Sequence, residues 1–220
     1  NILSKGNTVY QYNQSQITNP HTPTTIGMNS LPYDMNGNLL SFGDKSYNWS
    51  YRNEINQITQ NSKVYQYFYD HTSQRVKEIN NDIIKYTPNK YYTKTGSQLN
   101  KSVYLRDVLV GTIENTTVTY PLVNHLGSIE KITNTGGLMI EATDYYPFGK
   151  EVFHSGTNSQ RRFIGERYDN TTRLNYLNAR YCDGERGQFL SQDPMFWKMP
   201  SELLSDPQQL NSYSYARNNP

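Results

Sequence analysis

The stretch from Arg161 to Asp193 limits the fold most, because short apolar and aromatic runs alternate in it with clusters of turn-forming residues. The apolar runs are residues 174–181 and 189–190, and the turn clusters are residues 169–172 and 183–187. Runs rich in Tyr, Leu and Phe between Asp, Asn and Gly favour strands joined in hairpins. We therefore predict antiparallel β-structure here, with the second turn cluster folding the second run back beside the first.

The composition favours a β-rich domain over a disordered chain. Only 35% of the 220 residues are hydrophobic and the mean hydropathy is −0.84, but 13% are aromatic and 20 are Tyr. Disordered chains are poor in aromatic residues, whereas tyrosine fits the pleated surface of a sheet. The net charge of +2 is too small to indicate a nucleic-acid partner.

The chain also lacks the marks of a membrane-spanning segment. No apolar run approaches the roughly 20 residues that a helix needs to cross a bilayer. The sequence starts at Asn1 with neither Met nor a signal peptide. We interpret it as a fragment of a longer protein.

A short repeat follows a polar entry segment. Tyr33, Tyr51 and Tyr69 lie 18 residues apart. An apolar residue follows each by seven positions, namely Leu40, Ile58 and Val76. A fixed period of this kind indicates stacked hairpin units. We predict consecutive antiparallel hairpins from Tyr33 to Val76, with the three tyrosines on equivalent faces, because side-chain direction has period two and 18 is even.

Strand signals continue after the repeat, at residues 83–86, 103–105, 108–110 and 117–120. An edge strand is expected near residues 9–12, and a short helical turn capped by Ser201 at residues 201–204. Tyr176 and Phe163 are predicted core positions. The predicted parts of the chain are a polar entry segment (1–30), a hairpin region (31–160) and a C-terminal closing segment (161–220).

The closing segment resembles the C-terminal hallmark of the Rhs-repeat (YD-repeat) core proteins, which include bacterial polymorphic toxins and the C component of insecticidal toxin complexes. Residues 124–133 and 144–149 resemble two further boxes of that family, with Asn124 and Tyr146 where Asp is usual. The chain departs from the family at Phe196, where Gly is common, and in an inserted segment, residues 197–209. The hallmark residues in step are Phe163, Gly165, Tyr168, Asp169, Leu174, Tyr176, Ala179, Arg180, Tyr181, Asp183, Gly187, Phe189, Ser191, Asp193 and Pro194.

This resemblance implies an all-β fold in which consecutive antiparallel hairpins of a YD-repeat ribbon form part of a spiral hollow shell. It implies a structural function, namely that the shell, together with its remaining repeats, encloses and delivers a C-terminal toxin or effector of the same polypeptide. It also implies a secreted or cell-surface location. A further hypothesis, based on the tyrosine content, is a surface adhesin or carbohydrate-binding module that stacks sugars on exposed aromatic rings.

The resemblance also makes Arg180 and Asp193 candidate catalytic residues of a self-cleaving aspartic protease that releases the effector. In an aspartic dyad two close carboxylates share one proton, so that one activates water while the other acts as the acid. The second carboxylate would lie just past Pro220, so the fragment alone is expected to be inactive. The alternative is that Arg180 and Asp193 form only a fold-closing ion pair.

Other candidate chemistry is weaker. No pair among His21, His71, His125 and His154 has metal-ligand spacing, so neither a metal nor a cofactor is expected. Cys182 is interpreted as a small sheet residue rather than a nucleophile. Six arginines interleave with tyrosines as on a single-strand nucleic-acid surface, but neighbouring acids favour solvated sheet faces and cross-strand pairs instead. These are Arg161, Arg162, Arg167, Arg173, Arg180 and Arg186.

Overall fold

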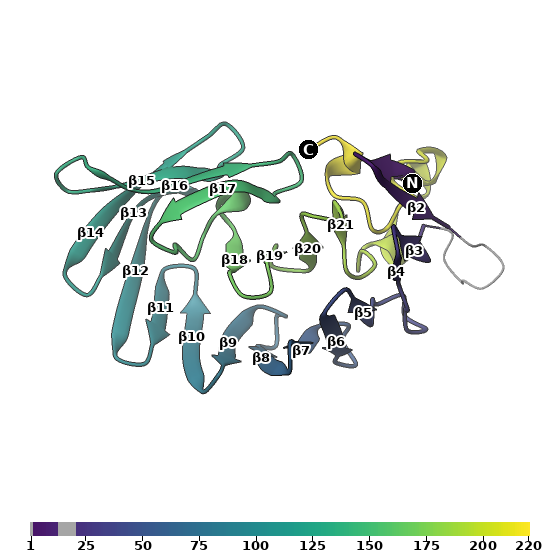
Figure 1. Ribbon diagram of the computed structural model, residues 1–220, viewed down its shortest axis with the longest axis horizontal. Coiled ribbons are helices and arrows are strands. Elements are labelled where there is room, and N and C mark those ends of the chain that lie inside the picture. The colour runs from purple at the N-terminus through teal and green to yellow at the C-terminus, as the bar shows by residue number, and fades with distance from the viewer. Residues whose placement is uncertain (1, 13–20) are drawn as a thin grey trace.

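The computed structural model describes residues 2–12 and 21–220, and strands dominate it (Figure 1). Consecutive strands pair antiparallel with one another in three sheets, so the predicted all-β fold of successive hairpins is confirmed. The strand predicted near residues 9–12 is β2, but it lies between β1 and β3 rather than at the edge of its sheet. Residues 1 and 13–20 of the predicted entry segment lie outside the described residues.

The strands are numbered along the chain. The first sheet contains β1 (Ser4–Lys5), β2 (Thr8–Gln11), β3 (Thr25–Ile26) and β4 (Asn29–Ser30). The large sheet contains β5 (Ser41–Phe42), β6 (Lys45–Trp49), β7 (Ile55–Gln60), β8 (Lys63–Tyr69), β9 (Arg75–Asn80), β10 (Ile83–Asn89), β11 (Tyr92–Thr95), β12 (Gln98–Leu105), β13 (Val108–Glu114), β14 (Thr117–Val123), β15 (Ile129–Asn134), β16 (Met139–Tyr145) and β17 (Glu151–Gly156). The third sheet contains β18 (Arg167–Asp169), β19 (Leu174–Tyr176), β20 (Tyr181–Asp183) and β21 (Gln188–Phe189). The short 3-10 helices are η1 (Phe163–Gly165), η2 (Phe196–Lys198), η3 (Ser201–Ser205) and η4 (Ala216–Asn218).

One five-residue turn recurs along the chain. In each copy, a side-chain oxygen of the first residue accepts the backbone N–H groups two and four positions later, and the residue three positions later has a positive φ. The backbone N–H of the first residue donates to the carbonyl four positions later. Side chains that bond their own backbone in this way stabilise tight reversals. The first residues are Asp34, Ser50, Asp70, Asn124 and Asn134.

This turn corrects the 18-residue period. Its second copy begins at Ser50, so the aromatic residue before it is Trp49, and Tyr51 lies inside the turn with 93% of its surface exposed. Tyr33 and Tyr69 directly precede their turns and are only partly exposed. The prediction of three equivalent tyrosines is therefore wrong. The repeat follows hydrogen bonding, which Asp, Ser and Asn can all supply, rather than the spacing of tyrosines.

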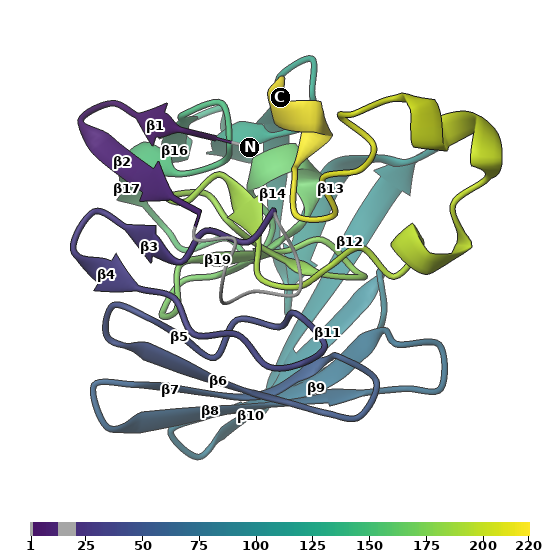
Figure 2. The ribbon, with the colours of Figure 1, turned by 90° about the vertical axis from the view of Figure 1, so that its right-hand side faces the viewer.

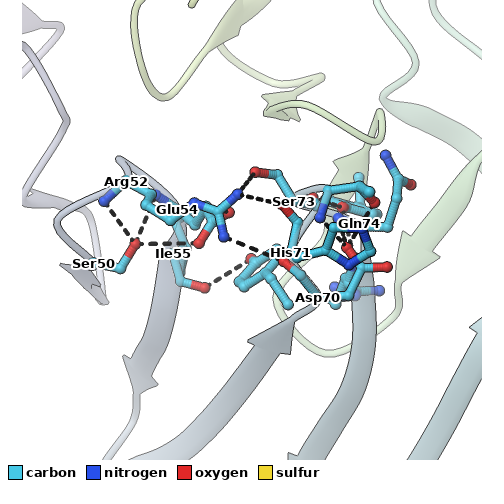
Figure 3. A network of polar contacts seen from close by, with 12 residues as sticks. Ser50, Arg52, Glu54, Ile55, Asp70, His71, Ser73 and Gln74 are labelled. Atoms are coloured by element: carbon cyan, nitrogen blue, oxygen red, sulfur yellow. Dashed lines mark hydrogen bonds and ion pairs between the residues drawn. The ribbon is translucent and has the colours of Figure 1, made fainter.

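The turns that lie at the same end of neighbouring strands are joined by side-chain hydrogen bonds. Trp49 Nε1 donates to Leu39 O, and Tyr69 Oη donates to Ile55 O, both at 2.8 Å. Each bond joins the aromatic residue before one turn to the residue that directly follows the previous turn. Arg52 reaches from the second turn to the third (Figure 3). Its acceptors there are Asp70 O, His71 O and Ser73 Oγ.

The closing segment packs inside the curve of the large sheet. In Figure 1, β18–β21 lie between β6–β10 on one side and β15–β17 on the other. Figure 2 shows β3–β5 continuing this wall near the N-terminus. One hydrophobic core joins the two layers, with Leu174, Tyr176 and Leu190 from the closing segment against buried residues of β6–β8.

The predicted core positions are largely confirmed. Tyr176 and Phe163 are each 2% exposed. Of the predicted apolar register, Ile58 is fully buried and Val76 is partly buried. Leu40 is exposed, whereas its neighbour Leu39 is fully buried in the core.

The apolar run 174–181 forms two strands rather than the one predicted. β19 and β20 pair antiparallel around a tight turn. Within this turn Leu177 N–H donates to Arg180 O at 2.9 Å, and Asn178 has a φ of 61°. Asparagine tolerates this left-handed conformation better than most residues, which explains the break in the run. The turn at 183–187 then places β21 beside β20, as predicted.

Candidate functional site

Arg75 anchors the closing segment to the ribbon. Its side chain is 1% exposed and pairs with Asp169 of β18, with Nη1–Oδ2 at 2.6 Å and Nη2–Oδ1 at 2.8 Å. The rings of Tyr176 and Tyr181 lie 4.6 and 5.7 Å from its guanidinium carbon. Burial opposes the charge, but Asp169, Tyr181 and Glu78 together raise the pKa of Arg75 above its ordinary value. A buried cation needs such close partners, and these hold β9 against β18 and β20.

Arg180 and Asp193 lie together, which confirms their predicted proximity. Arg180 Nη2 donates to Asp193 Oδ2 at 2.7 Å, and Arg180 Nη1 donates to Ser212 O at 3.0 Å. The guanidinium carbon lies 3.6 Å from the centre of the Phe189 ring. Burial lowers the pKa of Arg180, and the charge of Asp193 opposes this shift. The Arg180 side chain is 13% exposed and that of Asp193 is 36% exposed, so solvent reaches the pair from the carboxylate side.

Backbone pairing of the segment that carries Asp193, together with the N–H of Met195, orients the Asp193 carboxylate. Phe189 N–H donates to Tyr213 O, and Asp193 N–H donates to Ser212 O, both at 3.0 Å. The segment that carries Asp193 is thereby paired with the final run of the chain. Asp193 Oδ1 also accepts the N–H of Met195 at 2.9 Å. Both carboxylate oxygens therefore have a defined direction, one toward a cation and one toward a backbone amide.

A cavity of about 330 Å³, which we name the closing-segment cavity, opens beside Asp193. Among the described residues, no acidic side chain other than Asp193 lines it. Asp206 is the next acid in the sequence after Glu202. It forms an ion pair with Arg217 and accepts the N–H of Gln208 at 3.0 Å. The lining residues are Asp193, Met195, Phe196, Lys198, Met199, Pro200, Gln208, Gln209, Asn211, Ser212, Ser214, Ala216 and Arg217.

A larger hollow of about 520 Å³ lies against the inner face of β9–β14. Its strand residues share one face of the sheet, because they are cross-strand partners: Ser102 lies opposite Thr112, and Thr112 opposite Thr119. The hydroxyls of Thr112 and Thr119 are 2.6 Å apart. The lining from β11, β12 and β14 is therefore rich in hydroxyl and amide groups, whereas Leu109, Ile129, Ile132 and Ile140 form an apolar part of the same hollow. Further lining residues include Thr93, Thr95, Gln98, Asn100 and Thr117.

The interpretation of the six arginines as solvated is wrong for two of them. Arg162 and Arg186 are each 1% exposed. Arg162 forms an ion pair with Glu151, and Arg186 Nη2 donates to Tyr33 Oη at 3.3 Å. The closing segment lies inside the sheet, so the ribbon covers side chains that a free hairpin would expose.

Cys182 is a buried sheet residue, as predicted. It lies in β20 with no exposed surface, and burial raises the pKa of its thiol to about 12. A thiol of this kind is a poor nucleophile at neutral pH. In the described part of the chain, no group of three or more His, Cys, Asp or Glu side chains is placed to hold a metal ion. No helix within residues 2–12 and 21–220 has the length and apolar character to cross a membrane.

The fold and the closing segment define the class of protein: a ribbon of β-hairpins curved around an internal segment of its own chain. The teneurin YD-shell family model matches residues 2–220, and the chain belongs to this family. This agrees with the YD-repeat resemblance found in the sequence. The chain is therefore a structural segment of a β-shell.

The chain is similar to parts of much longer proteins. It is 28% identical over 215 residues to the tRNA3(Ser)-specific nuclease WapA of Bacillus spizizenii, which covers 90% of this chain and 9% of WapA. It is 24% identical over 247 residues to salivary gland surface protein 1 of Aedes aegypti, which covers 96% of this chain and 7% of that protein. The chain thus spans less than a tenth of the length of these relatives.

Solved structures share the fold. The crystal structure of TcdB2-TccC3 matches with a TM-score of 0.71 at 19% identity, over 97% of this chain and 13% of that chain. The Photorhabdus luminescens Tc holotoxin pore matches with a TM-score of 0.63 at 20% identity, over 85% of this chain and 10% of that chain. At this level of identity the likeness shows the fold alone.

Proposed function

We propose that this chain is part of the wall and inner closure of a hollow shell that encloses a C-terminal toxin or effector of the same polypeptide. The observation that carries the proposal is the curved large sheet, whose inner face binds the closing segment over β6–β9 and leaves a hollow over β9–β16 with many hydroxyl and amide groups in its lining. A wall that must not hold its cargo tightly is best lined by hydrated hydroxyl and amide groups, because these bury little apolar surface.

The similarity to a nuclease named WapA and to part of a toxin pore supports this function. Both relatives are far longer than this chain, so the enclosed effector would be encoded elsewhere in the polypeptide. A shell that carries such cargo out of a cell would be secreted or displayed on the cell surface.

Limited proteolysis of the full-length protein tests the enclosure. The C-terminal effector should resist digestion in the wild type and become digestible when Arg75→Ala releases the closing segment from β9. The matched control is Lys101→Ala, an exposed cation of β12. An effector that is digested equally fast in all three proteins would contradict the proposal.

We further propose that Arg180 and Asp193 belong to a self-cleaving aspartic protease. The observation in its favour is the oriented carboxylate: Asp193 is paired with Arg180 at 2.7 Å, stays accessible to solvent and borders a cavity. A charge-assisted bond to a guanidinium favours the ionised carboxylate, which suits Asp193 to the role of general base.

The reaction would be hydrolysis of a peptide bond. Asp193 takes a proton from a water molecule, and the water oxygen forms a bond to the scissile carbonyl carbon. A second, protonated carboxyl group donates its proton to the amide nitrogen as the C–N bond breaks. In this scheme the second carboxyl group would come from residues after Pro220.

The protease can be tested in a chain that is extended beyond Pro220, through the first Asp-Pro pair that follows, and that carries a tag after this pair. The tag should be released from the wild type but not from Asp193→Asn or Arg180→Ala, as followed on gels. Asp107→Asn, an exposed acid in a turn of the large sheet, is the control and should release the tag normally. If the extended wild type stays intact while its circular dichroism shows a folded protein, Arg180 and Asp193 are only a structural pair.

A further inference from the structure

We propose that the hollow over β9–β16 binds the phosphate group of a small hydroxyl-bearing molecule, such as a sugar phosphate, through Arg161 and Arg167. The inference goes beyond the enclosure and the protease proposed above and depends on neither. Three features carry it: the pairing of the two arginines, the shortage of carboxylates that neutralise them, and the lining of the hollow beside them.

Arg161 and Arg167 stand directly opposite each other in an isolated antiparallel bridge. The backbone hydrogen bonds at this bridge are made by the flanking residues, with Arg162 N–H bonded to Glu166 O at 2.9 Å. The two arginines are therefore a non-hydrogen-bonded pair, the position at which opposite side chains come closest. Both side chains line the hollow.

Two guanidinium groups in this position repel each other, because like charges directly opposite destabilise a strand pair. Acidic side chains relieve this repulsion only in part. Glu166 Oε2 lies 3.7 Å from Arg161 Nη1, which is too long for a hydrogen bond. Among residues 2–12 and 21–220, no acidic side chain forms an ion pair with Arg167. The pair thus carries an excess of positive charge.

Both guanidinium groups keep N–H groups for a ligand. Arg161 Nη1 donates to Gly165 O at 3.0 Å, and Arg167 Nη1 donates to Arg75 O at 2.8 Å. Each of these bonds uses one of the five N–H groups that a guanidinium carries. Burial, together with the charges of Arg75 and Arg161, lowers the pKa of Arg167 to about 10. Such a shift is typical of a cation without a balancing anion.

The other acids of the hollow do not supply this anion. Glu78 attracts Arg167, but its carboxylate lies 3.2 Å from Arg75 Nη2 and also forms an ion pair with Lys85. Glu114 is exposed at the end of β13. A phosphate monoester carries nearly two negative charges at neutral pH, and its oxygens match guanidinium groups through parallel N–H···O bonds. A phosphate group therefore balances the two arginines in both charge and geometry.

The rest of the lining suits a body that carries hydroxyl groups. The volume of about 520 Å³ is ordinary for a small-molecule site. A sugar ring presents hydroxyl groups at its edge and C–H groups on its faces, so that polar and apolar walls both have a counterpart. The polar wall includes Asn100, Ser102, Thr112 and Thr119, and the apolar wall includes Leu109, Ile129, Ile132 and Ile140.

Titration calorimetry of the full-length protein tests the inference with glucose 6-phosphate and with its two parts, inorganic phosphate and glucose. Glucose 6-phosphate should bind, inorganic phosphate should bind about tenfold more weakly, and glucose should give no heat. Arg161→Gln and Arg167→Gln should each weaken binding about tenfold or more, because each removes a charge-assisted hydrogen bond. The matched control is Lys101→Gln, an exposed cation of β12, which should bind like the wild type.

The absence of binding by both phosphate compounds would overturn the inference, and so would equal affinities in the wild type and the two arginine variants. Equal affinities for glucose 6-phosphate and inorganic phosphate would overturn the hydroxyl-bearing body of the ligand. The double change Thr112→Val and Thr119→Val leaves both arginines in place. It should weaken the binding of glucose 6-phosphate and leave that of inorganic phosphate unchanged.

A competition experiment needs no variant and therefore stands even if Arg167→Gln fails to fold. Inorganic phosphate should displace glucose 6-phosphate from the wild type, whereas acetate at the same concentration should not, because its single charge leaves one arginine unbalanced. Displacement by acetate as readily as by phosphate would overturn the assignment of a phosphate group.

Discussion

The two halves of the large sheet pair their strands in the same antiparallel way, but they differ in which face carries the apolar side chains. In β6–β8 the inner face is apolar: Tyr47, Ile58 and Tyr65 lie opposite one another in register and are 4%, 0% and 3% exposed. In β12–β14 the matching inner row is Ser102, Thr112 and Thr119. The outer face of the second half is apolar instead, with Val103, Leu105, Val108 and Tyr120 between 44% and 69% exposed.

The difference follows from what covers each half. The closing segment packs on β6–β8, so apolar side chains there are removed from water on folding. Over β10–β14 the inner face borders the hollow instead, and residues 157–161 and Arg167 line the hollow as well. Antiparallel hairpins fix which residues share a face but not which face is buried. Coverage, rather than strand pairing, therefore decides the chemistry of the wall.

The largest expected effect is the loss of the anchor that joins the covered half to the closing segment. Arg75→Ala should lower the free energy of unfolding by roughly 3–5 kcal/mol, because it leaves the Asp169 carboxylate buried without its cation. Denaturant titration measures the change, with Lys101→Ala on the uncovered half as the control. A loss in Arg75→Ala as small as that in the control would show that the closing segment does not depend on this pair.

A smaller loss is expected when the chemistry of the uncovered half is placed in the covered one. Ile58→Thr puts a hydroxyl at a fully buried position of β7, among the apolar and aromatic side chains of the core. We expect a loss of roughly 2–3 kcal/mol from the unpaired hydroxyl and the missing apolar surface. If the unfolding midpoint in denaturant does not move, the covered half is not a dry core.

The features predicted correctly from the sequence have local or motif-based causes. The hairpins of the closing segment follow from turn residues at short range, and the resemblance pairs Arg180 with Asp193 across 13 residues. The spacing of tyrosines misplaces Tyr51, because the turn residues and not the tyrosines define the repeat. The turns begin at Asp34, Ser50 and Asp70, which are 16 and 20 positions apart, so the repeat has no fixed period.

Long-range features had no comparable signal. Arg75 and Asp169 are 94 residues apart, and although Asp169 belongs to the family hallmark, nothing in the sequence marks Arg75 as its partner. The polar inner face near Thr112 was equally unpredictable, because an alternating strand looks the same whichever face is covered. The closing-segment cavity depends on how the inserted residues return to Ser212, which local propensities do not determine.

The turns of the two halves are expected to differ in how far acid destabilises them. The covered half uses Asp70, whose pKa is lowered by hydrogen bonds from Thr72 and from the N–H of Gln74, whereas the later half uses Asn124 in the same role. A carboxyl group with a lowered folded-state pKa stabilises the fold above its unfolded pKa of about 3.9, and this contribution is lost as the pH falls through the folded value.

Asp70→Asn should therefore reduce the drop in melting temperature between pH 6 and pH 3, because the amide oxygen can still accept the turn's N–H groups. The reverse change, Asn124→Asp, should increase the drop. Calorimetric scans at the two pH values measure both. Identical drops in Asp70→Asn and the wild type would show that the turn residues do not contribute to acid sensitivity.

The smallest effect is expected for the exchange that is the reverse of Ile58→Thr. The hydroxyls of Thr112 and Thr119 bond each other at 2.6 Å on the half-buried floor of the hollow. The double change Thr112→Val and Thr119→Val removes both partners together and keeps the side-chain shape, so no buried group loses its bond. We expect the free energy of unfolding to stay within about 0.5 kcal/mol of the wild type in denaturant titration.

The single change Thr112→Val is the control, because it leaves the Thr119 hydroxyl without this partner and should cost more than the pair. A double variant that is stabilised by several kcal/mol would mean that this floor is buried like the inner face of β6–β8, and the distinction between the two halves would fail.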